Sequence, residues 1–164
     1  NVQSIDGKET VFELFFPARK IEQADSVSTR DKSDSEEIKT NLEGKESILI
    51  IDDESVHREM LKNILNENGY TVYESRDGLQ GSSIFLKNQL NIDLVILDMS
   101  MPEMGGNATF IKLRELDPDI KIIINSGYAI DENISKILQH QQTDFIQKPF
   151  KPRKLLIKIR ALLD

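Results

Sequence analysis

The chain has 164 residues, which is enough for one well-buried domain and an additional segment. It contains no cysteine and only two histidines, so disulfide bonds, thiolate metal sites and a histidine-rich zinc site are excluded. Its net charge of -7 argues against nucleic acid as a direct partner, because phosphate contacts need clustered cations.

The first 46 residues divide into a strand-like piece and an acidic, polar stretch. Residues 11–16 have strand propensity on both faces and follow Asp6-Gly7, a common tight-turn pair. Residues 22–46 hold eight acids and four bases but few apolar side chains, so they cannot bury enough surface to offset their ordering entropy. We therefore predict a separate short piece over residues 1–20, a linker over 21–46 and a folded domain over 47–164.

From residue 47 onward, short apolar runs alternate with helical patterns. Such runs are typical of parallel strands that are buried on both faces. The pattern predicts strands at residues 48–51, 71–73, 94–98, 120–124 and 145–147. The predicted helices cover residues 54–68, a weaker segment after Asp77, a segment around Phe110, residues 130–138 and a segment ending near Leu163. Five such units indicate a three-layer α/β sandwich with right-handed crossovers.

Polar side chains stand where four of the apolar runs end. Ligands of parallel sheets bind outside the carboxyl ends of the strands, so we expect these side chains to meet at one rim. The group contains three carboxylates, a hydroxyl and an ammonium, which together suggest a chemical site rather than scattered surface charges. Its members are Asp52, Asp53, Asp98, Ser126 and Lys148.

Several separate motifs resemble one known family. The tracts ILIIDDE, DLVILDMSMPEMGG and DFIQKPF, together with Ser126-Gly127, occur in the order and at about the spacing of a response-regulator receiver domain. The resemblance covers residues 47–164. It implies a flavodoxin-like (βα)5 sandwich whose parallel sheet has the strand order 2-1-3-4-5.

The resemblance also implies roles for the acidic residues. Asp98 would accept a phosphoryl group, and Asp52, Asp53, Asp98 and the main-chain carbonyl of Ser100 would hold Mg²⁺. The physical logic agrees, because three carboxylates at close range repel each other and a hard divalent cation with oxygen ligands relieves that repulsion. Asp98 would then act as a carboxylate nucleophile and form an aspartyl phosphate.

Three further residues receive roles from the same resemblance. Lys148 would pair with Asp98 and later with the phosphoryl group, aimed by a cis Lys148-Pro149 peptide. The Ser126 hydroxyl would donate a hydrogen bond to a phosphoryl oxygen. Phe145 matches the aromatic switch position, where rotation of the ring changes the surface built from the fourth helix, the fifth strand and the fifth helix.

The resemblance predicts a phosphorelay role in the cytoplasm. The phosphoryl donor would be the phosphohistidine domain of a histidine kinase or a histidine phosphotransfer protein. No apolar stretch is long enough to span a membrane and no signal peptide pattern is present, so we expect no direct membrane contact in this fragment, although the parent protein could be membrane-anchored. Receiver chemistry would be limited to accepting the phosphoryl group and slowly hydrolysing it.

Two other functions fit parts of the pattern. A receiver-like interaction module that is never phosphorylated would share the fold. A phosphatase of the haloacid dehalogenase type also uses an aspartyl phosphate, but that class needs a second aspartate two residues after the nucleophile, where Ser100 stands.

The N-terminal piece resembles the last two strands of a histidine-kinase ATPase domain through the tract GKETVFELFFPA. Glu9 replaces the second glycine of that motif and Phe16 replaces its leucine. The absence of an initial Met agrees with a C-terminal fragment of a hybrid sensor histidine kinase. No glycine-rich phosphate loop is present, so the fragment lacks a kinase catalytic core and its status as an enzyme stays open. An incidental amphipathic tail is the alternative.

Four residues outside the motifs carry expectations of their own. We expect His57 to be solvated on the first helix and His140 to interact with the end of the fourth. Gln141 stands where receivers usually have glycine, so the fourth helix should end without a left-handed cap. Gly81 should weaken the second helix.

Overall fold

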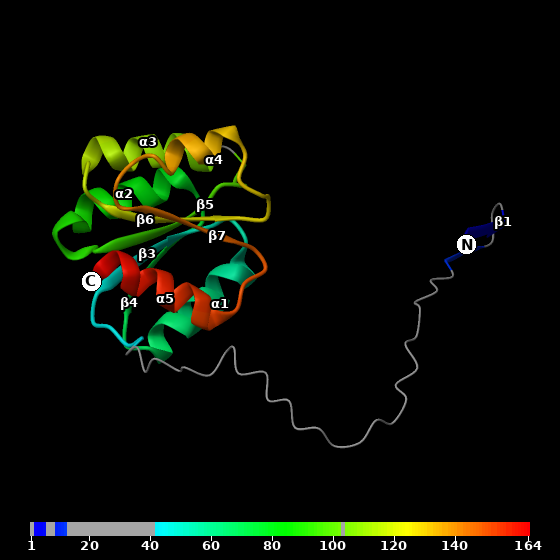
Figure 1. Ribbon diagram of the computed structural model, residues 1–164, viewed down its shortest axis with the longest axis horizontal. Helices are drawn as coiled ribbons and strands as arrows, with labels where there is room; N and C mark the ends of the chain where they lie inside the picture. The colour runs from blue at the N-terminus through cyan, green and yellow to red at the C-terminus, as the bar shows by residue number, and fades with distance from the viewer. Residues whose placement is uncertain (1, 6–8, 13–41, 103) are drawn as a thin grey trace, which may run out of the picture. The chain divides into compact units, whose positions relative to one another are not determined.

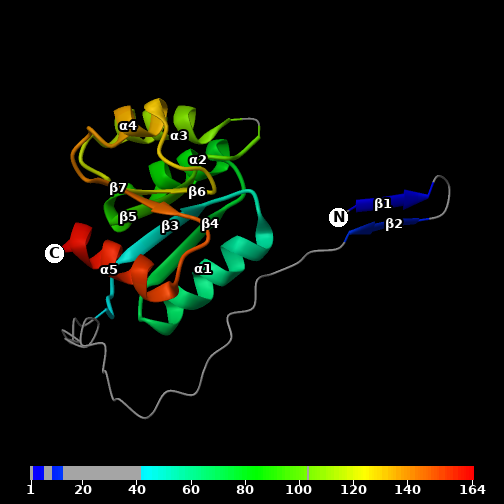
Figure 2. The same ribbon diagram turned by 45° about the vertical axis from the view of Figure 1, so that its right-hand side comes forward.

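The computed structural model describes residues 2–5, 9–12, 42–102 and 104–164. The chain divides into two units, Asn1–Glu37 and Ile38–Asp164. In the first unit, β1 (Val2–Ile5) and β2 (Glu9–Phe12) form an antiparallel pair (Figure 2). The strand predicted over residues 11–16 is therefore observed only in its first two residues, and its remainder and residues 21–41 of the predicted linker lie outside the described residues.

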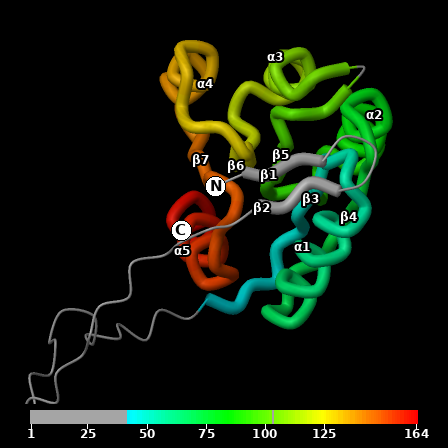
Figure 3. The backbone as a smooth tube through the Cα atoms, turned by 90° about the vertical axis from the view of Figure 1, so that its right-hand side faces the viewer, coloured from blue at the N-terminus to red at the C-terminus, as the bar shows by residue number. Residues whose placement is uncertain are grey.

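The second unit is built on a five-stranded parallel sheet. The strands follow the chain in the order β3 (Ser47–Ile51), β4 (Thr71–Ser75), β5 (Leu94–Asp98), β6 (Lys121–Ser126) and β7 (Thr143–Gln147). Their order across the sheet is β4-β3-β5-β6-β7, so β3 lies between β4 and β5 (Figure 3). Counted within this unit, the order is 2-1-3-4-5, which confirms the predicted flavodoxin-like fold.

Helices cover both faces of the sheet and form the two outer layers of the sandwich. They are α1 (Ser55–Glu67), α2 (Gly78–Asn88), a short 3-10 helix η1 (Gln89–Asn91), α3 (Gly106–Leu116), α4 (Glu132–Ile137) and α5 (Pro152–Leu163). Figure 1 shows α1 and α5 on one face and α2, α3 and α4 on the other. Within the described residues, no helix combines the length and apolar character that a membrane crossing requires.

Each face of the sheet has its own hydrophobic core, because successive residues of a strand point to opposite faces. Ile48, Ile50 and Ile123 pack with Leu61 of α1 and Leu155 of α5. On the opposite face, the neighbouring strand residues pack with side chains of α2, α3 and α4. That second core includes Leu49, Ile51, Ile122, Ile124, Phe85, Phe110 and Ile137. The strands are thus apolar on both faces, as buried parallel strands require.

Residues 42–46, at the end of the predicted linker, belong to the second unit and are bonded to its helices and loops. The Tyr70 hydroxyl donates a hydrogen bond to the Leu42 carbonyl at 3.0 Å. Arg160 of α5 donates to the Glu46 carboxylate at 2.8 Å and also pairs with Asp164. These contacts fasten the segment before β3 to α5 at the edge where the strands begin.

Two departures from glycine patterns have local explanations. A side chain at Gly81 would place its Cβ 2.5 Å from Cδ1 of Ile51, so this glycine lets α2 pack closely against β3. As predicted, α4 ends without a left-handed cap, because its C-cap Leu138 has right-handed helical angles; Gln142, four residues later, adopts a left-handed φ of 58°. Arg114 of α3 donates hydrogen bonds to the carbonyl groups of both glutamines and to Thr143 Oγ1, which holds this loop in place.

Candidate functional site

The three predicted acids meet at the carboxyl ends of β3 and β5. Asp52 and Asp98 are almost fully buried, with 1% and 3% exposure, whereas Asp53 is exposed. One carboxylate oxygen from each residue lies within 4.8 Å of those of the other two. β3 and β5 are neighbours; Asp52 directly follows the last residue of β3 and Asp98 is the last residue of β5, which explains why the sequence brings these carboxylates together.

Lys148 directly follows the edge strand β7, and its side chain reaches the same acids. Its Nζ donates hydrogen bonds to Oδ2 of Asp52 at 3.0 Å and to Oδ2 of Asp98 at 3.1 Å. The Lys148-Pro149 peptide is cis, as predicted. The Lys148 N–H donates to the Ser126 carbonyl at 2.8 Å, so the main chain of the lysine is tied to the end of β6.

Asp52 and Lys148 keep their charged forms although both are shielded from water. Burial favours the neutral form of Asp52, but hydrogen bonds from His57 and Lys148 outweigh it and hold the Asp52 pKa below its usual value. Burial likewise favours the neutral form of Lys148, but the hydrogen bonds and negative charges of Asp52 and Asp98 have the larger effect and raise the Lys148 pKa. The site therefore keeps an ionised carboxylate and an ammonium side by side at neutral pH.

His57 belongs to the site, so the expectation that it is solvated was wrong. Its Nδ1 lies 2.5 Å from Oδ2 of Asp52, and its side chain is only 12% exposed. The ring also contacts Phe150 edge-on, with centroids 6.0 Å apart. His57 lies in the first turn of α1, and this turn follows Asp52 so closely that it faces back toward the strand end. Its position in that turn was the signal available in the sequence.

The remaining predicted residues lie around the acids. Ser100 donates its N–H to Oδ1 of Asp98 at 3.1 Å. Ser126 is buried, and its Oγ accepts a hydrogen bond from the Tyr128 N–H at 3.1 Å. Phe145 is half-buried and packs against the core beneath α2, α3 and α4. The roles of these residues stay predictions, whereas their grouping near the ends of β5, β6 and β7 is observed.

The loop after Asp98 brings α3 close to the end of β5. A Cβ at Gly106 would lie 2.5 Å from both the Asp98 carbonyl oxygen and the Met99 Cα, so only glycine fits at this point. The N–H of Met99 donates to the Asn125 carbonyl at 3.1 Å, which continues the ladder past β5. The backbone around Asp98 is therefore fixed on both sides.

The donor set suits a hard divalent cation. Three carboxylates supply oxygen ligands, one of them exposed and two buried, and they lie close enough to share one ion. The described residues contain no cysteine and the one nearby histidine is occupied by Asp52, so the chemistry favours Mg²⁺ over zinc or copper.

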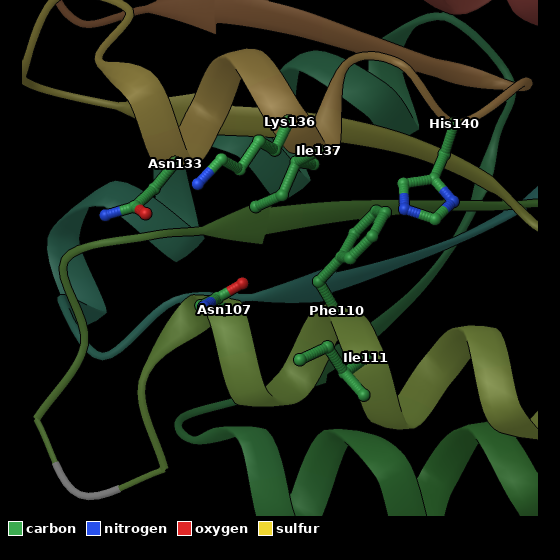
Figure 4. Close-up of a pocket in the computed structure, with 7 residues that line it drawn as sticks. All are labelled: Asn107, Phe110, Ile111, Asn133, Lys136, Ile137 and His140. Carbon is green, nitrogen blue, oxygen red and sulfur yellow. The ribbon is translucent and has the colours of Figure 1, made fainter.

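A hollow lies between α3 and α4 (Figure 4). It measures about 190 Å³ and is lined by Phe110 and Ile111 of α3 and by Lys136 and Ile137 of α4, among others. The His140 ring packs edge-on against Phe110 with centroids 5.3 Å apart, so it contacts α3 as well as following the end of α4. The lining brings no acids together, and we assign it no chemistry.

Comparison with known proteins agrees with this geometry. The family model described as "Response regulator receiver domain" matches residues 48–160. Sensor kinase CckA of Brucella abortus is 34% identical over 160 residues, which cover 96% of this chain but 17% of that protein. Aerobic respiration control protein ArcA of Escherichia coli is 37% identical over 71% of this chain and 48% of its own length. A receiver domain structure from Clostridium thermocellum superposes with a TM-score of 0.68 at 29% identity, covering 72% of this chain and 94% of its own.

Proposed function

This chain belongs to the response regulator receiver domain family, and from that premise we propose that it accepts a phosphoryl group on Asp98 in a phosphorelay. The observation that carries the proposal is Lys148, whose ammonium joins the buried carboxylates of Asp52 and Asp98 at 3.0 and 3.1 Å. A buried nucleophile next to a cation and two further acids is the arrangement that transfer to a carboxylate needs.

We assign the metal ligands to the same cluster. Asp52, Asp53 and Asp98 would hold Mg²⁺ through their carboxylates, and Ser100 would add its main-chain carbonyl. Bound there, the ion would neutralise negative charge on the phosphoryl oxygens during transfer. His57 and Lys148 hold the Asp52 carboxylate in a fixed orientation.

The transfer step uses one oxygen of the ionised Asp98 carboxylate. As its bond to phosphorus forms, the phosphorus–nitrogen bond of the donor phosphohistidine breaks and the imidazole keeps the electron pair. Lys148 stays beside the new aspartyl phosphate, and the Ser126 hydroxyl donates to one of its oxygens. Slow attack of water on the phosphorus then releases phosphate and restores the carboxylate.

We propose that Phe145 reports the state of the site. Phe145 and Ser126 lie on neighbouring strands, and the ring is half-buried between the core and solvent. Movement of Ser126 toward a phosphoryl group would open space for the ring to turn inward, which changes the surface formed by α4, β7 and α5.

We also propose a setting for the domain. The similarity to CckA covers 160 residues, more than the receiver match alone, and the antiparallel pairing of β1 with β2 is compatible with the resemblance of this segment to the last strands of a kinase ATPase domain. Residues 1–20 would then be the end of that domain, residues 21–46 a linker, and the whole a cytoplasmic part of a hybrid histidine kinase. Sequencing the coding region upstream of residue 1 tests this: an ATP-binding domain supports it and any other domain contradicts it.

The acceptor assignment is tested by phosphorylation from a small phosphodonor. Wild type and Asp98→Asn are incubated with acetyl phosphate and Mg²⁺, and bound phosphate is measured by intact mass. We expect wild type to gain one phosphoryl group and Asp98→Asn to gain none. Equal labelling of the two proteins would overturn the assignment, and no labelling of wild type would favour a module that works without phosphorylation.

A further inference from the structure

Asn125 is a fully buried polar residue whose side chain has no partner. It precedes Ser126 at the end of β6 and has 0% exposure. Neither Oδ1 nor Nδ2 makes a hydrogen bond to any described residue. A buried amide without hydrogen bonds costs stability, and Ile122, Ile123 and Ile124 of the same strand are all apolar. The polar side chain at this position is therefore unexplained by folding alone.

Asn125 lies in one row with the acids of the site. The register pairs Ile51 with Leu97, which puts Asp52 level with Asp98, and it pairs Asp98 with Asn125. Two residues earlier on β5 and β6, Ile96 and Ile123 both pack in the core beneath α1 and α5. By strand alternation, Asp98 and Asn125 face that same side. Neighbouring strands are about 4.8 Å apart, so Asn125 and Asp98 are adjacent residues on that face of the sheet.

The side chain of Lys148 extends across the end of β6, which carries Asn125, to reach the acids. It follows β7, which is separated from β5 by β6. Its Nζ nevertheless contacts Asp98 on β5 and Asp52 beyond β3. The aliphatic chain of Lys148 therefore passes over the end of β6, where Asn125 stands.

We propose that Asn125 is a positioning residue for Lys148, with Oδ1 as a second acceptor for its ammonium. The inference rests on the proposed function. Oδ2 of Asp52 is shared by Lys148 and His57, so a cation bound through that oxygen would compete with both. An ammonium that gives up Asp52 needs another acceptor, because unpaired buried donors are costly. Asn125 supplies one without adding negative charge, and it keeps Lys148 beside Asp98.

The test compares Asn125→Leu, which removes the acceptor at similar volume, with Asn125→Thr, which keeps an oxygen. Mg²⁺ affinity is measured by titration calorimetry, and thermal unfolding is followed in a chelator. We expect Asn125→Leu to bind Mg²⁺ about tenfold more weakly, the loss of one hydrogen bond to a charged group. Asn125→Thr should stay within about threefold of wild type. The melting temperature of Asn125→Leu should rise, because an unpaired buried amide is removed.

A double-mutant cycle identifies the partner. If Asn125 acts through Lys148, Asn125→Leu should not change Mg²⁺ affinity in a Lys148→Met background. The inference is overturned if Asn125→Leu binds like wild type, loses the same affinity without Lys148, or melts at a lower temperature. Failure of wild type to bind Mg²⁺ would overturn the proposed function as well, whereas binding that is unaffected by Asn125→Leu overturns this inference alone.

Discussion

At the scale of single residues, the site depends on opposite charges that are buried together. Asp52 and Lys148 each make the charged form of the other more favourable, and the pKa values of both depart from their usual 3.8 and 10.5 in the directions that keep them charged. Breaking such a pair leaves a buried charge without its partner, which costs more than the pair itself contributes.

The sign of the pH dependence follows from these directions. A lowered carboxyl pKa contributes stability that is present above the unfolded pKa and is lost as pH falls through the folded pKa. A raised lysine pKa contributes stability that is present below the unfolded pKa and is lost as pH rises through the folded pKa. Both contributions are therefore complete at neutral pH, and the Asp52 contribution disappears only below about pH 4.

Lys148→Met tests this pairing. We expect the free energy of unfolding to fall by about 3 kcal/mol at neutral pH, measured by urea unfolding. The difference from wild type should shrink below about pH 4, as the Asp52 carboxylate takes up a proton. Lys136→Met is a matched control, because Lys136 is exposed on α4 and should change stability by less than about 0.5 kcal/mol. Equal effects of the two substitutions would contradict the pairing.

At the scale of elements, the close contact of α2 with β3 depends on a missing side chain. Ile51 occupies the space that a Cβ at position 81 would need. Gly81→Ala should therefore lower the free energy of unfolding by about 1 to 3 kcal/mol, although alanine is the better helix former. Ser83→Ala is the control, because Ser83 is exposed on the same helix. A higher melting temperature for Gly81→Ala would contradict this prediction, because it would show that Ile51 can move aside for a Cβ at little cost.

The elements also show what the sequence could predict. Apolar runs ending at Asp52 and Asp98 were sufficient to predict the strands and the grouping of the acids, because a parallel sheet places all carboxyl ends at one edge. The position of His57 was missed, because helical spacing alone did not show that the first turn of α1 faces the strand end. The left-handed Gln142 was missed for a different reason, since Arg114 holds it from another helix.

At the scale of the whole molecule, the chain combines a complete receiver fold with a separate hairpin. The receiver part accounts for both hydrophobic cores and for every residue of the site. The hairpin and the similarity to CckA support only the proposal that this receiver is part of a hybrid kinase. The motifs predicted the receiver because they lie at the ends of four of its five strands, whereas the short N-terminal tract predicted its context through fewer positions.

The central claim is that the carboxylate of Asp98 carries the phosphoryl group. Borohydride reduces an acyl phosphate to an alcohol, so treatment of the phosphorylated chain followed by peptide mass spectrometry marks the acceptor directly. We predict homoserine at position 98, formed only when both phosphodonor and Mg²⁺ were present. Reduction at Asp52 or Asp53, or no reduced residue in a chain that has gained phosphate, would contradict the account.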